Sequence, residues 1–97
     1  MKKSAYYINY IKSDAWKRKR LEYFARYGKF CQACGTRKNI VVHHLTYDRL
    51  GNELLTDLKS LCSVCHLAVH AQHRKKGGNL AFWTNQHVFK ERKKRKL

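Results

Sequence analysis

The hydrophobic pattern in the first third of the chain is that of one amphipathic helix. Four aromatic residues fall at helical spacing and share one face: Trp16, Tyr23, Phe24 and Tyr27. Ser13 is a favourable N-cap residue, Asp14 suits the positive end of the helix dipole, and Gly28 suits a left-handed cap at the other end. The pattern predicts a helix from residue 14 to residue 27 with a basic exposed face.

A short strand, a polar loop and a second helix are predicted further along. The β-branched run Ile40–Val42 indicates the strand, and residues 46–56 indicate the loop. The next segment opens at Asp57 and passes through a pair of cysteines into a helix over residues 63–76, which two consecutive glycines end.

This second helix has two chemically distinct faces. His66, His70 and His73 share one side, and four apolar residues share the opposite side: Val64, Leu67, Ala68 and Ala71. Because an apolar face packs inward, we expect the histidine face to look onto a cleft or solvent. In residues 79–97 we expect a first half that docks aromatic side chains on the core as a helix, and a disordered basic end.

Composition adds an argument about partners. The 97 residues make a single domain, and 22 Lys and Arg against 6 Asp and Glu give a formal charge of +16. Such a charge disfavours the compact state by self-repulsion, so a polyanionic partner is expected, and nucleic acid suits it best. Charge alone does not separate an enzyme from a small ribosomal or histone-like protein.

No segment has the pattern of a signal peptide or the roughly 18 apolar residues of a membrane span. We therefore expect a cytoplasmic protein, in a bacterial or phage-infected cell, with no membrane partner. In that reducing compartment, paired cysteines hold metal more often than they form disulfides.

The four cysteines form two pairs, Cys31-x-x-Cys34 and Cys62-x-x-Cys65. Each pair offers two thiolates from one tight turn, and two pairs complete the tetrahedral set of a Cys₄ zinc site. The alternatives are four buried cysteines or two disulfides. A zinc ion held by four sulfurs has no open position, so we expect this site to be structural.

Four of the six histidines stand beside these cysteines in the sequence: His43, His44, His66 and His70. Two imidazoles at i and i+4 on a helix can bind one ion, which predicts a second metal site. Because neighbouring residues of a strand point to opposite faces, His43 and His44 can both reach it only where the strand ends or twists. For His73 and His87 we expect a solvated surface position.

A longer string of residues resembles the HNH endonuclease family, in the branch with a Cys₄ zinc, over about residues 16–70. The string is His43-His44-Leu45-Thr46-Tyr47, Leu50-Gly51-Asn52-Glu53, Asp57-Leu58 and Leu61-Cys62-x-x-Cys65-His66-x-x-x-His70.

The resemblance implies a fold, a set of ligands and a base. The fold is a small zinc-containing ββα-metal (His-Me finger) domain of the α+β class, with a flanking N-terminal helix, a core over residues 13–76 and a basic extension over residues 79–97. His43, His66 and His70 hold a catalytic divalent cation (Mg²⁺, Mn²⁺, Ni²⁺, Co²⁺ or Zn²⁺), and His44 is the general base.

The residue that braces the hairpin loop and orients the base is normally Asn in this family, and here Asp57 stands in its place. An ionised Asp keeps the acceptor function but offers no N–H donor. The sequence leaves open whether Asn52 or Glu53 helps to brace the loop and orient His44.

The implied activity is hydrolysis of DNA phosphodiesters, with double-stranded DNA as the expected substrate and a protein partner or homodimer as a source of specificity. We expect phosphate contacts from eight basic residues of the two helices: Lys17, Arg18, Lys19, Arg20, Arg26, Arg74, Lys75 and Lys76. The alternatives are a non-catalytic zinc module that binds nucleic acid, and the nuclease domain of a toxin.

Overall fold

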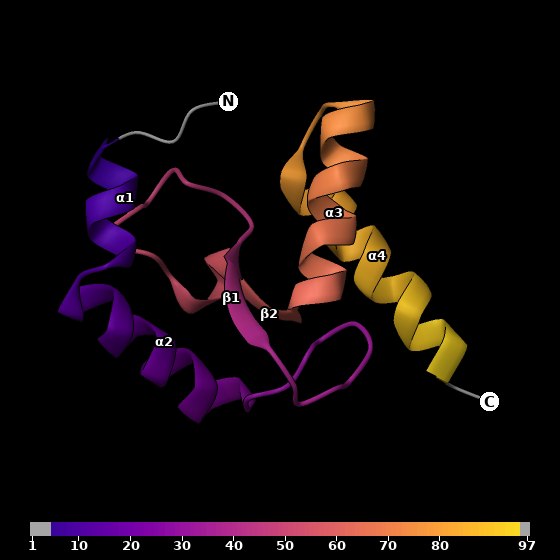
Figure 1. Ribbon diagram of the computed structural model, residues 1–97, viewed down its shortest axis with the longest axis horizontal. Coiled ribbons are helices and arrows are strands. Elements are labelled where there is room, and N and C mark those ends of the chain that lie inside the picture. The colour runs from indigo at the N-terminus through magenta and orange to yellow at the C-terminus, as the bar shows by residue number, and fades with distance from the viewer. Residues whose placement is uncertain (1–4, 96–97) are drawn as a thin grey trace.

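The computed structural model describes residues 5–95 as a compact α+β arrangement of four α-helices around a two-stranded sheet (Figure 1). In chain order the elements are α1 (Ala5–Ile11), α2 (Asp14–Tyr27), β1 (Ile40–His44), the 3₁₀ turn η1 (Leu55–Asp57), β2 (Leu58–Cys62), α3 (Ser63–Lys76) and α4 (Leu80–Arg95). None of the helices in this range has both the length and the apolar character that crossing a membrane requires.

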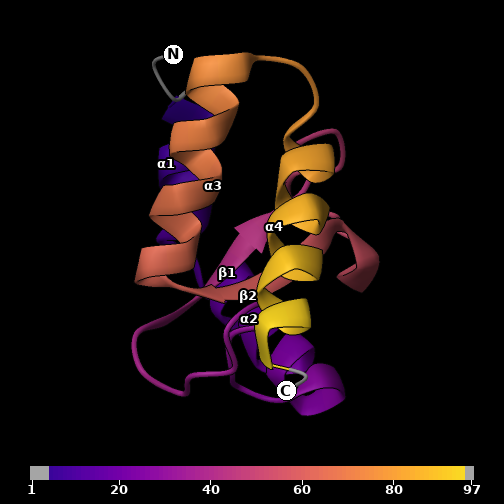
Figure 2. The ribbon, with the colours of Figure 1, turned by 90° about the vertical axis from the view of Figure 1, so that its right-hand side faces the viewer.

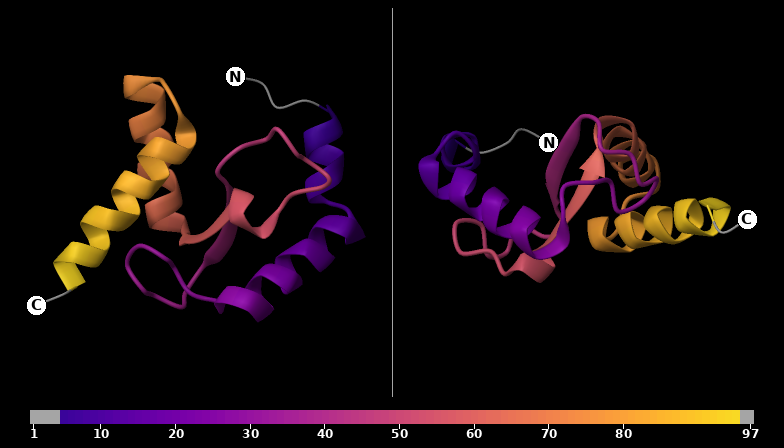
Figure 3. Two further views of the ribbon diagram at one scale, coloured as in Figure 1. Left: turned by 180° about the vertical axis from the view of Figure 1, so that it is seen from behind. Right: turned by 90° about the horizontal axis from the view of Figure 1, so that it is seen from below.

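The antiparallel hairpin of β1 and β2 lies at the centre of the molecule. Ile40 pairs with Cys62, His43 with Lys59, and His44 with Leu58. Helices α1 and α2 lie on one side of the hairpin and α3 and α4 on the other, as Figures 1 and 3 show. Each strand therefore presents its alternating side chains to two different helix pairs.

Two hydrophobic clusters make up the core. The cluster at the cysteine end consists of Cys31, Ala33, Ile40, Leu61, Cys62, Cys65, Val69 and Val88. The second cluster, under α1 and α2, consists of Tyr10, Trp16, Tyr23, Val42 and Leu58. Both clusters include residues of both strands, so the hairpin joins them into one domain core.

Helix α2 forms as its sequence predicts. The Ser13 hydroxyl accepts a hydrogen bond from the Trp16 amide at 3.2 Å, and the Gly28 amide donates to the Phe24 carbonyl at 2.8 Å with φ at 90°. Helix α1 precedes it and was not predicted, although it supplies the buried Tyr10 to the core.

Helix α3 also has the predicted bounds, and His66 and His70 face a cavity as expected, but the prediction that its apolar face packs inward is wrong. The four apolar residues expected to pack inward are exposed, with Val64 at 73% and Leu67 at 66% of their full accessibility. Cys65 and Val69 are the buried residues, and His66, His70 and His73 are half-buried. Contacts with the cysteine cluster and the hairpin set the orientation of the helix, and they outweigh the burial of these four apolar side chains.

The end of the tail is ordered rather than disordered. Helix α4 continues to Arg95 and packs beside α3, as Figure 2 shows, with Val88 buried in the core. The guanidinium group of Arg92 donates two hydrogen bonds to Gln32, at 2.8 and 2.6 Å, and these tie the basic half of the helix to the cysteine loop. Residues 96 and 97 lie outside the described range.

The orientation of α3 predicts unequal effects of two matched truncations. Val69→Ala should lower the free energy of unfolding by about 2 kcal/mol, because Val69 is 1% exposed and its truncation leaves a cavity. Val64→Ala, on the same helix, should change it by less than about 0.5 kcal/mol. Urea denaturation of both variants measures the difference. A larger loss for Val64→Ala would contradict the orientation.

Candidate metal centres and histidine cavity

The four cysteine thiols meet at one point between the loop before β1 and the junction of β2 with α3. All four Sγ atoms lie within 4.8 Å of one another, and Sγ of Cys34 lies 3.7 Å from Sγ of Cys62. Sulfurs bound at about 2.3 Å to a tetrahedral zinc are about 3.8 Å apart, whereas a disulfide brings them to about 2.05 Å. The four cysteines are free thiols with the spacing that a zinc ion requires.

Backbone amides favour the thiolate form of Cys31, whereas burial and the neighbouring thiols raise the pKa of Cys34 and of Cys65. The amides of Cys34 and Cys65 donate to the sulfurs of Cys31 and Cys62, each at 3.4 Å. Burial raises the pKa of Cys31, but the amides that face it outweigh this effect and lower the pKa to about 7. Thiolates are the form that binds zinc, so the amide contacts of the turn favour the metal-binding form of Cys31.

Three imidazoles meet at a second point, on the side of the hairpin that faces α3. The ring of His43, from β1, lies 5.1 Å from the ring of His66 and 5.1 Å from the ring of His70, measured between centroids. The Nε2 atoms of His66 and His70 are 3.1 Å apart. Nitrogens bound at about 2.0–2.1 Å to one cation are separated by about 2.9–3.4 Å in octahedral or tetrahedral geometry.

The His43 ring is held by a residue of α4. Its Nε2 atom lies 3.0 Å from Oγ1 of Thr84, which is fully buried. The Thr84 hydroxyl donates to the Leu80 carbonyl at 2.8 Å, so its oxygen accepts the Nε2–H of His43. Nδ1 of His43 is then left with a lone pair, which is the state a ligand requires.

Burial and the neighbouring imidazoles keep His43 neutral. Burial is the larger cause, and together with the charges of His66, His70 and His44 it lowers the pKa of His43 to about 3. A neutral imidazole can bind a cation without first losing a proton. The three histidines can therefore hold one divalent cation.

His44 turns to the other side of the strand, toward α1 and α2. Its Nε2 atom lies 2.7 Å from the Glu53 carboxylate, and its ring stacks on Trp16 at 4.8 Å and on Tyr47 at 5.2 Å. The hydroxyl of Tyr10 donates to the other oxygen of Glu53 at 2.6 Å. Tyr10 thus brings the unpredicted helix α1 into the site.

The Glu53 carboxylate is ionised and buried. Burial raises its pKa, but the hydrogen bonds from Tyr10 and His44 outweigh burial and lower it overall. An ionised carboxylate accepts the Nε2–H of His44, so in the neutral form of this imidazole the lone pair is on Nδ1.

His43 and His44 line the same cavity although they follow each other in one strand. The cavity measures about 260 Å³, and its wall includes His66 and His70 from α3 and the rings of Tyr7, Trp16 and Tyr47. Neighbouring strand residues point to opposite faces, and both side chains can reach one cavity here because the strand ends at His44. A ligand in this space can contact all four imidazoles.

Asp57 braces the loop rather than the His44 ring. Its carboxylate accepts two hydrogen bonds from the guanidinium of Arg49 and one from the Leu54 amide at 3.0 Å. These contacts, the Arg49 hydrogen bond first, lower the pKa of Asp57. Its backbone carbonyl accepts from the Leu45 amide at 2.7 Å and closes the hairpin loop. Of the two residues left open as partners in orienting His44, Glu53 makes the contact.

The predicted phosphate contacts lie on opposite sides of the hairpin. Lys17, Arg18, Lys19, Arg20 and Arg26 belong to α2, and Arg74, Lys75 and Lys76 form the exposed last turn of α3. On α2, Lys17 pairs with Asp14 at 4.0 Å and Lys19 with Glu22 at 3.7 Å. The Lys17–Asp14 pair is exposed and weak, so Lys17 can exchange it readily for phosphate, whereas the side chain of Lys19 is half-buried.

Thr84 and Tyr10 carried no signal in the sequence, because each is an ordinary helix residue whose partner is distant in the chain. His87 was expected at the solvated surface, and that prediction is wrong. His87 is half-buried, its Nε2 atom is buried without a hydrogen bond, and its ring nitrogens lie near Cys65 and Glu91.

Comparison of the chain with family models, with curated proteins and with solved structures returned no match. The function is therefore argued from the geometry of these two centres and from the residues around them.

The cysteine cluster predicts one tightly held zinc. X-ray absorption of the purified protein should show four sulfurs at about 2.3 Å, and a chelator strong enough to remove the metal should unfold the chain, as circular dichroism will report. Cys34→Ser should lower the zinc content, whereas His70→Ala should leave it unchanged. Zinc ligated by nitrogen and oxygen only would contradict the assignment.

The Thr84 contact predicts a role for α4 in cation binding. Thr84→Val keeps the shape but removes the acceptor for His43, so the affinity for Ni²⁺ or Co²⁺ should fall by about tenfold or more. Thr84→Ser keeps the hydroxyl and should bind nearly as the wild type does. Calorimetric titration of the zinc-loaded proteins measures both. Equal affinities for Thr84→Val and the wild type would exclude the role.

Proposed function

We propose that this protein is a metal-dependent DNA endonuclease of the HNH type. The observation that carries the proposal is the meeting of His43, His66 and His70 with His44 in one cavity, beside a separate cysteine cluster. A structural role alone does not account for four imidazoles around one hollow, because a fully apolar wall would pack better. The sequence resemblance assigns the same residues to the same tasks.

The three imidazoles on the α3 side form the cation site in this proposal. A divalent cation bound there would polarise a phosphodiester oxygen and offset the negative charge that develops as the bond breaks. His43 contributes Nδ1, because its Nε2–H is committed to Thr84. His66 and His70 approach from adjacent turns of α3 and leave the cavity side of the site for the substrate.

His44 serves as the general base. Its Nε2–H is held by Glu53, so Nδ1 is the ring nitrogen that can act as the proton acceptor. That nitrogen can take a proton from a water molecule as the water attacks phosphorus. The ionised Glu53 fixes the tautomer and stabilises the imidazolium that forms, and Tyr10 keeps the carboxylate in place.

The cysteine cluster has a structural task. We propose that it holds zinc, which has no open position among four sulfurs. The zinc joins the loop before β1 to the start of α3, so it sets the position of His66 and His70 relative to His43.

Double-stranded DNA is the proposed substrate, since the net charge of +16 favours a polyanion and the cations of α2 and α3 suit phosphate contacts. Such contacts carry no sequence information. Any specificity would come from a protein partner or from a second copy of the chain.

The proposal predicts that His44 is required for cutting but not for folding. His44→Ala should lower the rate of plasmid nicking with Mn²⁺ or Mg²⁺ by at least about 100-fold, because the proton acceptor is lost. Glu53→Gln should cost less, since its amide oxygen can still accept the Nε2–H. His73→Ala is the matched control: its ring bonds the Gly78 carbonyl at 2.9 Å, away from the cavity, and its rate should equal that of the wild type.

Each variant is checked for zinc content and for its thermal midpoint before the rates are compared. If zinc-loaded, folded His44→Ala cuts as fast as the wild type, the assignment of the base fails. If the wild type does not cut with any of the five cations but binds DNA, the chain is a binding module and the enzyme proposal fails.

A further inference from the structure

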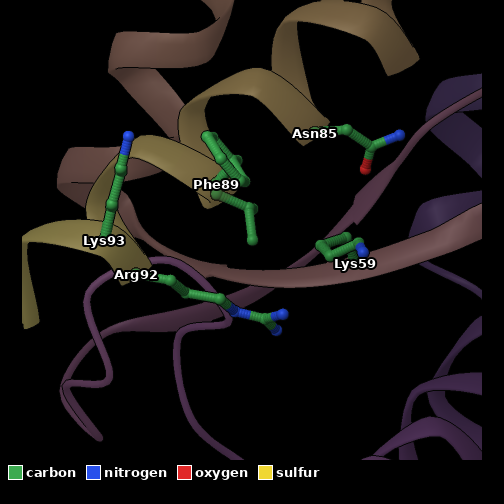
Figure 4. A pocket seen from close by; sticks show the side chains of 6 residues that line it. Lys59, Asn85, Phe89, Arg92 and Lys93 are labelled. Atoms are coloured by element: carbon green, nitrogen blue, oxygen red, sulfur yellow. The ribbon is translucent and has the colours of Figure 1, made fainter. Parts of the chain in front are cut away.

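A second cavity lies between β2 and α4, outside the histidine site. It measures about 430 Å³ and is lined by Lys59, Asn85, Val88, Phe89, Arg92 and Lys93. Figure 4 shows Lys59 on the strand, with the other labelled side chains projecting from α4 around the same space. No carboxylate is among the lining residues, and the volume lies within the range of about 300–1,000 Å³ that is typical of ligand sites.

This cavity adjoins the histidine site. Lys59 is the cross-strand partner of His43, so the two side chains emerge on the same face of the hairpin. On α4, Asn85 directly follows Thr84, the residue that holds His43. A polymer bound at His43 therefore needs to extend only a short way along this face to enter the second cavity.

The cations of the cavity are not neutralised within the protein. No ion pair of residues 5–95 includes Lys59, Arg92 or Lys93. Lys59 is half-buried, and burial together with the charge of Arg92 lowers its pKa. Arg92 is fixed by its two hydrogen bonds to Gln32, which use Nε and Nη2 and leave Nη1 available. An anion is the ligand that would offset this charge.

An exposed aromatic ring lies among these cations. Phe89 is 64% exposed, and the ammonium of Lys93 lies 5.6 Å from its ring centroid. Asn85, Phe89 and Arg92, which all line the cavity, follow at helical spacing along one side of α4. The acid of this helix, Glu91, lies on the opposite side and pairs with Lys94 at 2.8 Å. An aromatic ring among cations is a surface that suits an unpaired nucleotide.

We propose that this cavity binds one unpaired nucleotide of the substrate strand, next to the bond that is cut, with its base on Phe89 and its phosphate on Lys59 and Lys93. The proposal rests on the proposed function, because it takes nucleic acid to be the substrate. Both faces of a base inside a duplex are covered by the neighbouring base pairs, so such a base can stack on the Phe89 ring only after leaving the duplex. The preferred DNA therefore has an unpaired segment beside the cleavage site.

Binding measurements test the cavity without depending on cleavage. The probes are a fluorescein-labelled 12-nucleotide oligothymidine and a blunt 12-base-pair hairpin, titrated by fluorescence anisotropy with zinc-loaded protein and no other divalent cation. Phe89→Ala should weaken binding of the single strand by about tenfold and of the blunt hairpin by less than about twofold. Phe89→Tyr keeps a ring and should restore the affinity.

Phe82→Ala is the matched control, because Phe82 is 56% exposed on the same helix but does not line the cavity. Its affinity for the single strand should equal that of the wild type. An unchanged affinity for Phe89→Ala overturns the proposal, as does an equal loss for Phe82→Ala. Competition by poly-glutamate as strong as that by oligothymidine also overturns it, in favour of an acidic protein partner.

Plasmid nicking by the same preparations separates this proposal from the enzymatic one. If the wild type nicks DNA while Phe89→Ala binds the single strand normally, only the cavity proposal fails. If Phe89→Ala loses single-strand binding while the wild type does not cut, only the nuclease proposal fails.

Discussion

The structure depends on the meeting of four cysteine thiols at the junction of β2 and α3. A chain of this size buries too little surface to fix its own helices firmly, so a point where distant segments meet in the core has a large effect. The sulfurs of Cys34 and Cys62, from the two segments, lie 3.7 Å apart. With the start of α3 held there, Cys65 and Val69 turn inward, and His66 and His70 face His43.

The histidine site is shaped as much by the residues behind it as by the imidazoles themselves. His43 and His44 alternate in one strand, and each commits its Nε2–H to a partner on its own side, Thr84 for His43 and Glu53 for His44. Each ring is thereby left with Nδ1 as its lone-pair nitrogen. One strand end thus brings two imidazoles with different hydrogen-bond partners to a common cavity, where the proposed function gives them the roles of cation ligand and proton acceptor.

The distribution of charge agrees with this division of the molecule. Two of the 6 acidic residues, Glu53 and Asp57, are buried in and beneath the loop behind His44, where each accepts hydrogen bonds. The cations lie on α2, at the end of α3 and along α4, at the surface. A carboxylate therefore orients the His44 imidazole from behind, and most of the positive charge lies at the surface, where the proposed nucleic-acid substrate would meet it.

The sequence by itself determined the features that depend on neighbours in the chain. Three features could be predicted because each depends on spacings within a few residues. They are the caps of α2, the pairing of the cysteines, and the i, i+4 spacing of His66 and His70. Only the tertiary structure decided which way α3 faces, since Val64 and Leu67 gain less from burial than the cysteine cluster and the hairpin contacts gain from the observed orientation. Tyr10 and Thr84 likewise depend on partners 43 and 41 residues away. Contacts between residues so far apart in the chain are set by how whole helices and strands pack together. Patterns within a few residues of the sequence do not predict that packing.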